Sequence, residues 1–441
     1  MATRRWLGVA ANKTHVVTVT IANTWATGDT ITLTIANVDF VVTIGALVTT
    51  AQVATTLKEA FNGETLTDTT ASFTPNGSSG AQDIGFFAEI EASVSSSVVT
   101  FTARTSGVPF TMTATESTAG SGTATLATSV SATGRNFFSD QDNWSGNTVP
   151  VDGDDIVFDS GDIDVLHGLS PAIQPGSVTI TRGYTGRIGL PDINPGPSGT
   201  SGDLKFYEYR TRRLTFDNNS TTCTYTIGQR EGQGSGMIRI DAGAGRSTVN
   251  VWSTGQNRYD QGLPAFEFVG THANNAMYVM DGDACAAFQK GDSTTLSILQ
   301  IGTDATSNAR MAVGEDATLT TVVQSGGSLT ISASCTTFTM HGGEATQLAG
   351  SPATLRINAG EYVDRSTTTL ATELTVGSRG HYNRTQDNRA KTITPEITLY
   401  SGSKFHDPNK TLTLTGGFET VGCGIENCEI SLGVGRSYTA T

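Results

Sequence analysis

The sequence has 441 residues, of which 7% are aromatic and 15% charged, with 50 glycines. This length allows two or three domains, and the chain is poor in the Leu, Glu and Lys that cover helix faces. The net charge of −14 excludes nucleic acid as the main partner, because phosphate binding requires a basic surface. No apolar run is long enough for a signal peptide or a membrane span, so we expect synthesis in the cytoplasm and no membrane partner. Short alternating runs of Thr, Val and Ile, separated by Gly and Asn, predict an all-β fold.

The chain opens with a short basic arm, residues 1–14. Its positive charges are Arg4, Arg5 and Lys13, and its one large aromatic residue is Trp6. A small β-rich domain is predicted to follow over residues 15–130. Its first half has alternating strands and the only convincing helix of the chain.

This helix is predicted over Thr50–Phe61. Thr49 or Thr50 can cap its start, and Gly63 follows its end. One face is apolar, with Val53, Ala54, Leu57, Ala60 and Phe61 at helical spacing. Strands are predicted around it at His15–Ile21, Thr30–Ala36, Phe40–Ile44, Ile84–Ala92, Val98–Ala103 and Pro109–Thr115, and Glu116–Gly134 is read as a linker or a plain edge strand.

Residues 131–295 are predicted to form an aromatic cap and an irregular β region. Phe137, Phe138 and Trp144 bring aromatic bulk just ahead of the repetitive part, where a solenoid needs cover for the open end of its core. Strands continue to about residue 290 with long Gly- and Pro-rich connections.

Residues 296–441 are periodic. Alternating apolar runs end in glycine corners at Ala312–Gly314, Gln324–Gly327, Met340–Gly343, Ile357–Gly360, Val376–Gly380 and Tyr400–Gly402. The interval grows from 13 to about 22 residues, which is typical of a parallel β-solenoid whose coils vary in one loop. An antiparallel β-sandwich with similar turns is the alternative for this distal part.

No catalytic, cofactor or metal site is predicted, because no sequence motif for a nucleophile, a zinc site or a nucleotide is complete. The segment Gly243–Thr248 resembles a phosphate loop but has no lysine, and the five cysteines are scattered and odd in number. Two metal alternatives stay open: calcium at an acidic run, and a site at Cys423, Cys428 and His406. The acidic run comprises Asp152, Asp154, Asp155, Asp159, Asp162 and Asp164, and solvated turns explain it as well.

A glycosidase on a β-helix would need two carboxylates placed across a groove. The candidates are Glu315, Asp316, Glu344, Glu361 and Asp364. Glu344 and Glu361 follow glycines at matching places, so they can stack on neighbouring coils. The same placement also suits two solvated turn residues, and no catalytic pair is assigned.

The first domain resembles a β-rich module that recurs in structural proteins of tailed-bacteriophage virions. The resemblance rests on Val17–Ile21, Thr24–Thr30, Phe40–Ile44, Thr50–Phe61 and Ser106–Thr111, about a quarter of the chain. The periodic half is similar to phage tailspike, head-fibre and cement proteins at the level of architecture. Such proteins are usually homotrimers with an N-terminal part anchored on the particle. By this resemblance Arg4, Arg5, Trp6 and Lys13 would anchor the chain.

The hypothesis that follows is that the chain is a non-enzymatic virion protein, either a capsid decoration (cement) protein or a short head or tail fibre. It implies location in the virion and partnership with itself and with the major capsid protein or tail proteins. A receptor-binding tailspike that recognises or cuts host surface polysaccharide is the alternative. A bacterial surface adhesin built on a β-solenoid is a second alternative.

Overall fold

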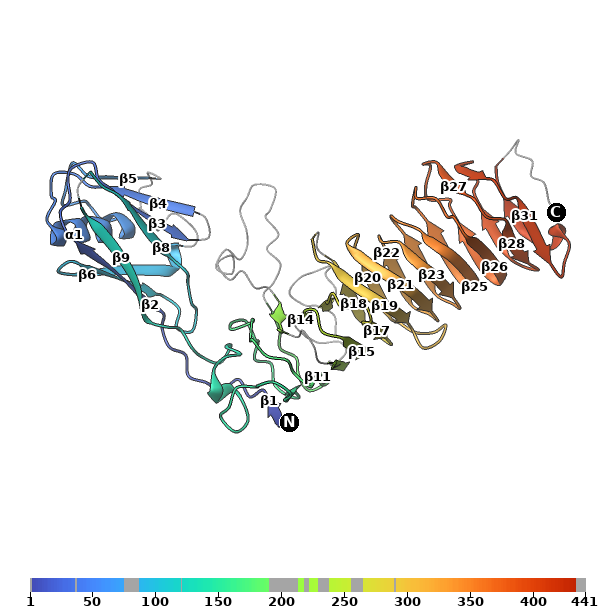
Figure 1. Cartoon of the computed structure of the whole chain (residues 1–441), viewed down its shortest axis with the longest axis horizontal. Helices are drawn as coiled ribbons and strands as arrows, with labels where there is room; N and C mark the ends of the chain where they lie inside the picture. The colour runs from blue at the N-terminus through green and yellow to red at the C-terminus, as the bar shows by residue number, and fades with distance from the viewer. Residues whose placement is uncertain are drawn as a thin grey trace. The chain divides into compact units, whose positions relative to one another are not determined.

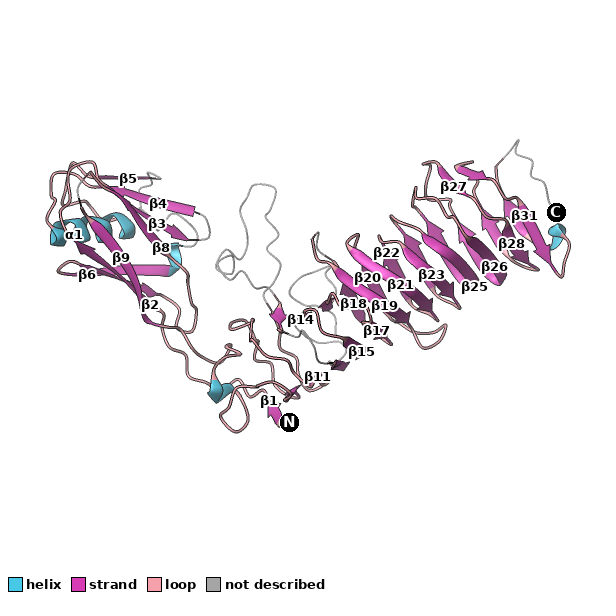
Figure 2. Cartoon of the chain, in the orientation of Figure 1, coloured by secondary structure: helices cyan, strands magenta, loops and turns pink. Residues whose placement is uncertain are grey.

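The structure is a computed structural model, and it describes residues 2–35, 38–74, 87–119, 121–189, 213–217, 222–228, 238–254, 265–288 and 291–433. The described part of the chain is almost entirely β, as Figure 2 shows. It divides into two compact units. The solenoid unit contains residues 2–7, 144–189 and 213–433, and the insert unit contains Gly8–Asn143.

In its described residues, the insert unit has two four-stranded antiparallel sheets and one α-helix. The first sheet has the order β6 (Ile90–Ser95), β7 (Val98–Ala103), β2 (Val16–Ala22) and β9 (Thr123–Val130), and the second has β5 (Ser72–Thr74), β4 (Val38–Thr43), β3 (Thr30–Ile35) and β8 (Thr113–Ser117). The predicted strands are confirmed within a few residues; of Ile84–Ala92, residues 84–86 lie outside the described part. The stretch Glu116–Gly134 supplies an edge strand, β9, paired with β2.

Helix α1 (Thr50–Asn62) confirms the predicted helix. The Thr49 side chain accepts from the Gln52 backbone, the Gln52 side chain reaches back to Thr49, and Gly63 ends the helix at φ 69°. These contacts form a capping box and a left-handed C-cap, so both ends are set by local sequence. The predicted apolar face is the buried one, packed against β6, β2 and β7.

The solenoid unit is a parallel ladder, which confirms the solenoid and not the sandwich. Strands alternate between two stacks, so that from β11 to β23 each strand pairs with the next but one in sequence, as the side-by-side strands of Figure 1 illustrate. The first stack is β1 (Thr3–Arg5), β10 (Asp155–Phe158), β11 (Ser177–Ile180), β13 (Cys223–Gly228), β15 (Ser247–Ser253), β17 (Ala276–Val279), β19 (Thr294–Ile301), β21 (Ala317–Gln324), β23 (Cys335–Met340), the first halves of β25 (Pro352–Asp364) and β26 (Glu373–Asn383), β28 (Ile397–Tyr400) and β31 (Phe418–Val421). The second stack is β12 (Leu214–Thr215), β14 (Ile238–Asp241), β16 (Phe266–Val269), β18 (Asp283–Ala286), β20 (Arg310–Val313), β22 (Ser328–Ile331), β24 (Glu344–Gln347), the second halves of β25 and β26, β29 (Lys404–His406) and β32 (Glu429–Ser431).

The rungs differ in length because one return loop grows. Val322 pairs with Phe338, Phe338 with Leu355, Leu355 with Leu374 and Leu374 with Ile397, so the rung lengthens from 16 to 23 residues. The longer return loops add a small third sheet of β27 (Lys391–Ile393) and β30 (Leu412–Leu414). The 13 residues between Gly314 and Gly327 are not one rung, because the two glycines lie at different corners. Val313 ends a second-stack strand, whereas Gln324 ends a first-stack strand.

The core of the solenoid is made of side chains stacked rung on rung. In the second stack Tyr362, Tyr382 and Phe405 lie above one another, with ring centroids 6.0 Å and 4.8 Å apart. All three are fully buried. Each rung therefore covers the apolar face of its neighbour, as repeat architectures require.

Three corner glycines are stacked so closely that a side chain would collide with the rung before. Gly343 has φ 82°, and a Cβ there would lie 2.3 Å from the Gly327 carbonyl oxygen. A Cβ on Gly360 would likewise lie 2.4 Å from the Gly343 carbonyl oxygen. The corner thus requires glycine for its backbone conformation and for its space.

We expect Gly343→Ala to lower the free energy of unfolding of the solenoid unit by about 3 kcal/mol, the sum of left-handed strain and a forced backbone shift. Gly153 is the matched control, since it has φ 78° but nothing within 4 Å of a Cβ. Gly153→Ala should cost only about 1 kcal/mol. Urea titrations of both variants test this, and equal losses would contradict the collision.

The solenoid contains residues from both sides of the insert unit. β1 pairs in parallel with β10, Thr3 opposite Asp155 and Arg5 opposite Val157. Trp6 and Trp144 then form an antiparallel bridge, with the Ser145 amide donating to the Arg5 carbonyl at 2.9 Å. The chain thus leaves the first rung after Trp6 and returns beside it, and the insert unit lies between these two points in sequence.

A buried histidine in the early rungs gives the solenoid unit an acid-sensitive step. His167 is 6% exposed, and burial lowers its pKa to about 4 from an ordinary value of 6.5. Protonation therefore favours the unfolded chain, so the stabilising effect is complete above pH 6.5 and is lost as the pH falls towards 4.

We expect the free energy of unfolding to fall by about 2–3 kcal/mol from this group between pH 7.5 and pH 4.5. Denaturant titrations of wild type and His167→Gln at both pH values measure it, because the variant should lose that part of the dependence. His341→Gln, at an exposed position, is the control. An unchanged pH dependence in His167→Gln would contradict the assignment.

Candidate functional site

A column of polar side chains runs along the outer face of the second stack. Its members are register partners on successive rungs: Asp283, Arg310, Ser328, Glu344, Glu361, His381, Lys404 and Glu429. We call this set the polar column. Neighbouring parallel strands lie about 4.8 Å apart, so each side chain is within reach of the next.

Local sequence explains why these residues point outward. Glu344, Glu361 and His381 each follow a corner glycine directly. The next residue in each strand, such as Ala345, Tyr362 or Tyr382, is buried. Because side chains alternate between the two faces of a strand, the residue after the corner must face solvent.

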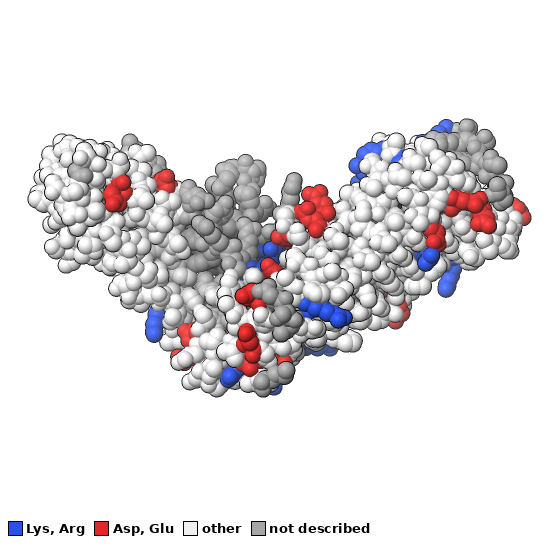
Figure 3. Space-filling model, viewed as in Figure 1, with Lys and Arg blue, Asp and Glu red and all other residues white. Residues whose placement is uncertain are grey.

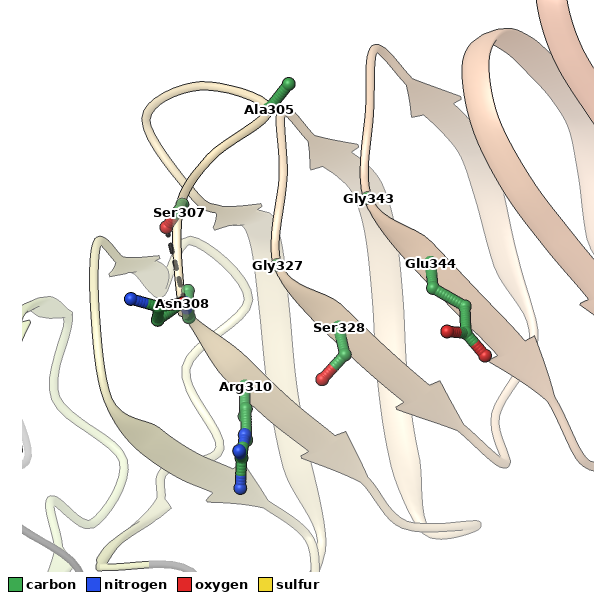
Figure 4. Close-up of a pocket in the computed structure, with 9 residues that line it drawn as sticks. Ala305, Ser307, Asn308, Arg310, Gly327, Ser328, Gly343 and Glu344 are labelled. Atoms are coloured by element: carbon green, nitrogen blue, oxygen red, sulfur yellow. Dashed lines mark hydrogen bonds between the residues drawn. The ribbon is translucent and has the colours of Figure 1, made fainter.

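The polar column borders a shallow cavity of about 420 Å³. Arg310, Ser328 and Glu344 stand at the starts of three successive strands, as Figure 4 shows, and the rest of the lining comes from the loop containing Ala305, Ser307 and Asn308 and from the corner glycines. The site therefore offers a guanidinium, a carboxylate, hydroxyls and an amide on a rigid frame. Such groups suit hydrogen bonding to a polar ligand.

Opposite charges are neighbours at the two ends of the polar column, and two like charges are neighbours in its middle. Arg310 lies 3.7 Å from Asp283, and Lys404 lies 2.8 Å from Glu429. Glu344 and Glu361 are adjacent carboxylates, which confirms the predicted stacking on neighbouring coils. Two like charges on neighbouring strands repel, so this part of the column favours a ligand with hydrogen-bond donors or positive charge.

The other candidate carboxylates are placed apart from this pair. The Asp316 side chain accepts from the Gly291 amide at 2.6 Å, and Glu315 borders a second hollow on the first stack. Asp364 is fully buried with Lys391 at 2.7 Å and Arg384 at 3.4 Å. A polysaccharide on the surface has no access to Asp364.

The buried group around Asp364 is a structural network. The Tyr382 hydroxyl donates to Asp364 at 2.6 Å, and Arg384 also donates to the Ser366 carbonyl at 2.9 Å and to the Thr411 hydroxyl at 2.8 Å. Burial lowers the pKa of Lys391, and Asp364 opposes that shift. Every charge here is held by a partner from another rung, as buried ions require.

Two arginines of the basic arm form ion pairs with two aspartates of the acidic run. Arg4 pairs with Asp154 at 3.1 Å, and Arg5 pairs with Asp159. Hydrogen bonds from the Ala2 and Val151 amides, together with Arg4, outweigh burial and lower the pKa of Asp154. Asp152, Asp155 and Asp164 each accept from a different group, namely the Gln174 amide, the Ser177 hydroxyl and the Arg187 amide.

The four candidate anchoring residues are divided between the two units. The Trp6 ring is 2% exposed, packed against Trp144 at 5.2 Å, and its Nε1 donates to the Ile163 carbonyl. Lys13 belongs to the insert unit, where its amide donates to the Thr133 carbonyl at 2.9 Å. Of the three residues in the solenoid unit, Arg5 keeps the most exposed side chain, at 51%. Whether any of them binds a particle stays a prediction.

The structure brings together two histidines that were not predicted from the sequence to be in contact. His381 and His406 lie in contact on the outer face, flanked by Glu361 and Glu429. Of the two cysteines considered with His406, the Cys428 thiol donates to the Tyr400 carbonyl at 3.5 Å. Within the described residues, no group of three or more His, Cys, Asp or Glu side chains is arranged to hold a metal ion.

Comparison with known proteins adds no identification. No protein-family model, no curated protein and no solved structure matches this chain. Among the described residues, no helix has the length and apolar character needed to cross a membrane.

Proposed function

We propose that the chain is a non-enzymatic structural component of a tailed-bacteriophage virion, a capsid decoration protein or a short head or tail fibre. The observation that carries this proposal is the continuous parallel ladder from β1 to β32. Each rung rests only on its neighbours, so the ladder is a rigid scaffold that suits display. The resemblance of the insert unit to a module of phage virion proteins supports the particle as the setting.

The surface chemistry supports the same role. On the face in Figure 3, Lys, Arg, Asp and Glu are few and scattered, and most of the surface is uncharged. The net charge of −14 is spread over 441 residues. Such a surface stays soluble at the high local copy number of a particle without attracting nucleic acid. By the same resemblance we propose a homotrimer that contacts the major capsid protein or tail proteins.

The docking element in this proposal is the insert unit. Arg4 and Trp6 are committed to the first rung, so they are poor candidates for contact with a second protein. The insert unit leaves and rejoins the solenoid at the Trp6–Trp144 bridge. A folded module inserted at one point of a scaffold can dock while the scaffold stays intact.

The test begins with gradient-purified particles of the phage whose genome encodes this chain. We expect mass spectrometry to find the chain in stoichiometric amounts. A variant in which Gly8–Asn143 is replaced by a short Gly/Ser turn between Leu7 and Trp144 should keep the solenoid folded and lose the particle. Absence of the chain from particles would overturn the proposal, and particle binding by the variant would overturn docking through the insert unit.

A receptor-binding tailspike is the second candidate, favoured by the polar column and its cavity. Glu344 and Glu361 are in register on adjacent strands, and retaining glycosidases hold two carboxylates about 5–5.5 Å apart. Incubation with host capsule or lipopolysaccharide, followed by assay for released oligosaccharide, separates the two functions. Release abolished by Glu344→Gln and Glu361→Gln would favour the tailspike.

A further inference from the structure

The strongest feature without an assigned role is a row of four side chains in contact on the outer face of the last rungs. His381 on β26 and His406 on β29 lie with Nε2 of the first 3.0 Å from Nδ1 of the second. Their rings meet edge to face at 74°, with centroids 4.5 Å apart. Nδ1 of His381 lies 3.3 Å from Oε1 of Glu361, and Nε2 of His406 lies 3.0 Å from Oε1 of Glu429.

Two neutral rings cannot supply an N–H to both carboxylates and also to each other. Each carboxylate is an acceptor, so it favours an N–H on the ring nitrogen that it faces. A neutral histidine has one N–H. When the ring nitrogens that face Glu361 and Glu429 carry the two N–H groups, Nε2 of His381 and Nδ1 of His406 face each other as two lone pairs 3.0 Å apart. A third proton, or a metal ion in its place, removes the repulsion.

The outer groups are fixed in place by further contacts. The Asn383 side chain donates to Oε1 of Glu361 at 2.5 Å, and its own carbonyl accepts from the Thr385 amide at 2.8 Å. Lys404 binds Oε2 of Glu429 at 2.8 Å, which leaves Oε1 for His406. The two carboxylates that face the rings are therefore themselves held in place, as the outer partners of metal-binding histidines are.

The spacing of the two inner nitrogens fits a metal ion. Metal–imidazole bonds of about 2.0–2.1 Å at angles of 90–110° place two nitrogens about 2.9–3.4 Å apart. The observed 3.0 Å lies in this range. The His381 and His406 side chains are 21% and 18% exposed, so water can reach the remaining coordination positions.

We propose that His381 and His406 together bind one divalent transition-metal ion, Cu²⁺, Ni²⁺ or Zn²⁺, with Glu361 and Glu429 as the carboxylates that set the ring tautomers. Water completes the coordination, because the described residues supply no third ligand of the His, Cys, Asp or Glu type. The ion joins β26 to β29 and so clamps the distal rungs. Imidazole ligands give the order Cu²⁺ above Ni²⁺ and Zn²⁺.

The test is a calorimetric titration of the full-length chain with NiCl₂, in a Cys423→Ser, Cys428→Ser background that removes thiol binding. We expect one equivalent bound, at least tenfold weaker binding in His381→Gln and in His406→Gln, and no change in His341→Gln. Glu429→Gln should weaken binding about tenfold, because the ring tautomer is no longer imposed. No saturable binding below millimolar NiCl₂, or one equivalent retained in the double variant His381→Gln, His406→Gln, would overturn the site.

A second measurement needs no substitution. Diethyl pyrocarbonate labels accessible histidine nitrogens, and peptide mass spectrometry reads each site. Added NiCl₂ should protect His381 and His406 and leave His341 as reactive as before. Equal labelling of His381 and His406 with and without NiCl₂ would overturn the proposal even if the variants fail to fold.

Discussion

Replacing Trp6 by alanine is expected to lower the free energy of unfolding of the solenoid unit by about 3–5 kcal/mol. The ring is 2% exposed, meets Trp144 edge to face, contacts Phe158 at 6.1 Å and donates to the Ile163 carbonyl. Alanine would leave a cavity between β1 and the next rung. It would also remove one of the two hydrogen bonds to the Ile163 carbonyl, the other coming from the Tyr184 hydroxyl at 2.9 Å. Denaturant titration followed by far-ultraviolet circular dichroism measures the loss.

Two other tryptophans provide matched controls. Trp252 lies on the same unit but is 57% exposed, so Trp252→Ala should change stability by less than about 0.5 kcal/mol. Trp25 is buried in the core of the insert unit, so Trp25→Ala should destabilise that unit and leave the solenoid transition in place. If Trp6→Ala behaved like Trp252→Ala, β1 would not be part of the folded ladder.

This result also bears on anchoring of the chain. Deletion of residues 2–14 removes β1, Trp6 and the Arg4–Asp154 pair, so loss of particle binding in that variant would reflect damage to the first rung as well as any lost contact. Arg5→Ala is a cleaner test. Its side chain is half exposed and its pair with Asp159 lies at the surface, where an ion pair contributes about 0–1 kcal/mol.

Local signals in the sequence were enough to predict the helix and most strands. The cap at Thr49, the stop at Gly63 and the apolar face between them act within a few residues of one another. The glycine corners of the distal rungs are similarly local, because each needs left-handed backbone and open space at one position. These features therefore predicted both the insert unit's helix and the solenoid class.

Contacts between distant residues were not predictable in the same way. Thr3 pairs with Asp155 across the whole insert unit, and nothing in either short segment records the other. The basic arm and the acidic run were each visible in the sequence, but they were interpreted separately, as an anchor and as a calcium site or solvated turns. Opposite sign was the one signal that linked Arg4 and Arg5 to Asp154 and Asp159, and it carries no distance information.

The histidine pair was hidden by the variable rung length. A column on a solenoid can be read from sequence when the repeat is constant, as for Glu344 and Glu361, which are 17 residues apart and in register. The next rungs are longer, and His381 faces Lys404 while His406 faces Asn383. The contact between the two rings is a diagonal one across these strands, so no fixed period predicts it.

Asp364→Asn is expected to destabilise the solenoid unit by about 3–5 kcal/mol, because it removes one partner from a buried ionic group. The replacement keeps the shape of the side chain and removes its charge. Arg384 and Lys391, both fully buried, would then have lost the carboxylate that lies 3.4 Å and 2.7 Å from them. Urea-induced unfolding of the variant at pH 7 measures the loss.

The exposed pair of Arg356 and Glu373 is the control for this prediction. Two bonds of 2.7 Å join Arg356 to Glu373, and the side chains are 47% and 35% exposed. Their geometry is better than that of Arg384 and Asp364, yet water can replace the lost partner, so Glu373→Gln should cost no more than about 1 kcal/mol. A ranking by bond geometry would predict the opposite order. If Glu373→Gln were as damaging as Asp364→Asn, burial would not be what makes the distal network important, and the fixed position of β25 against β26 and β27 would need another explanation.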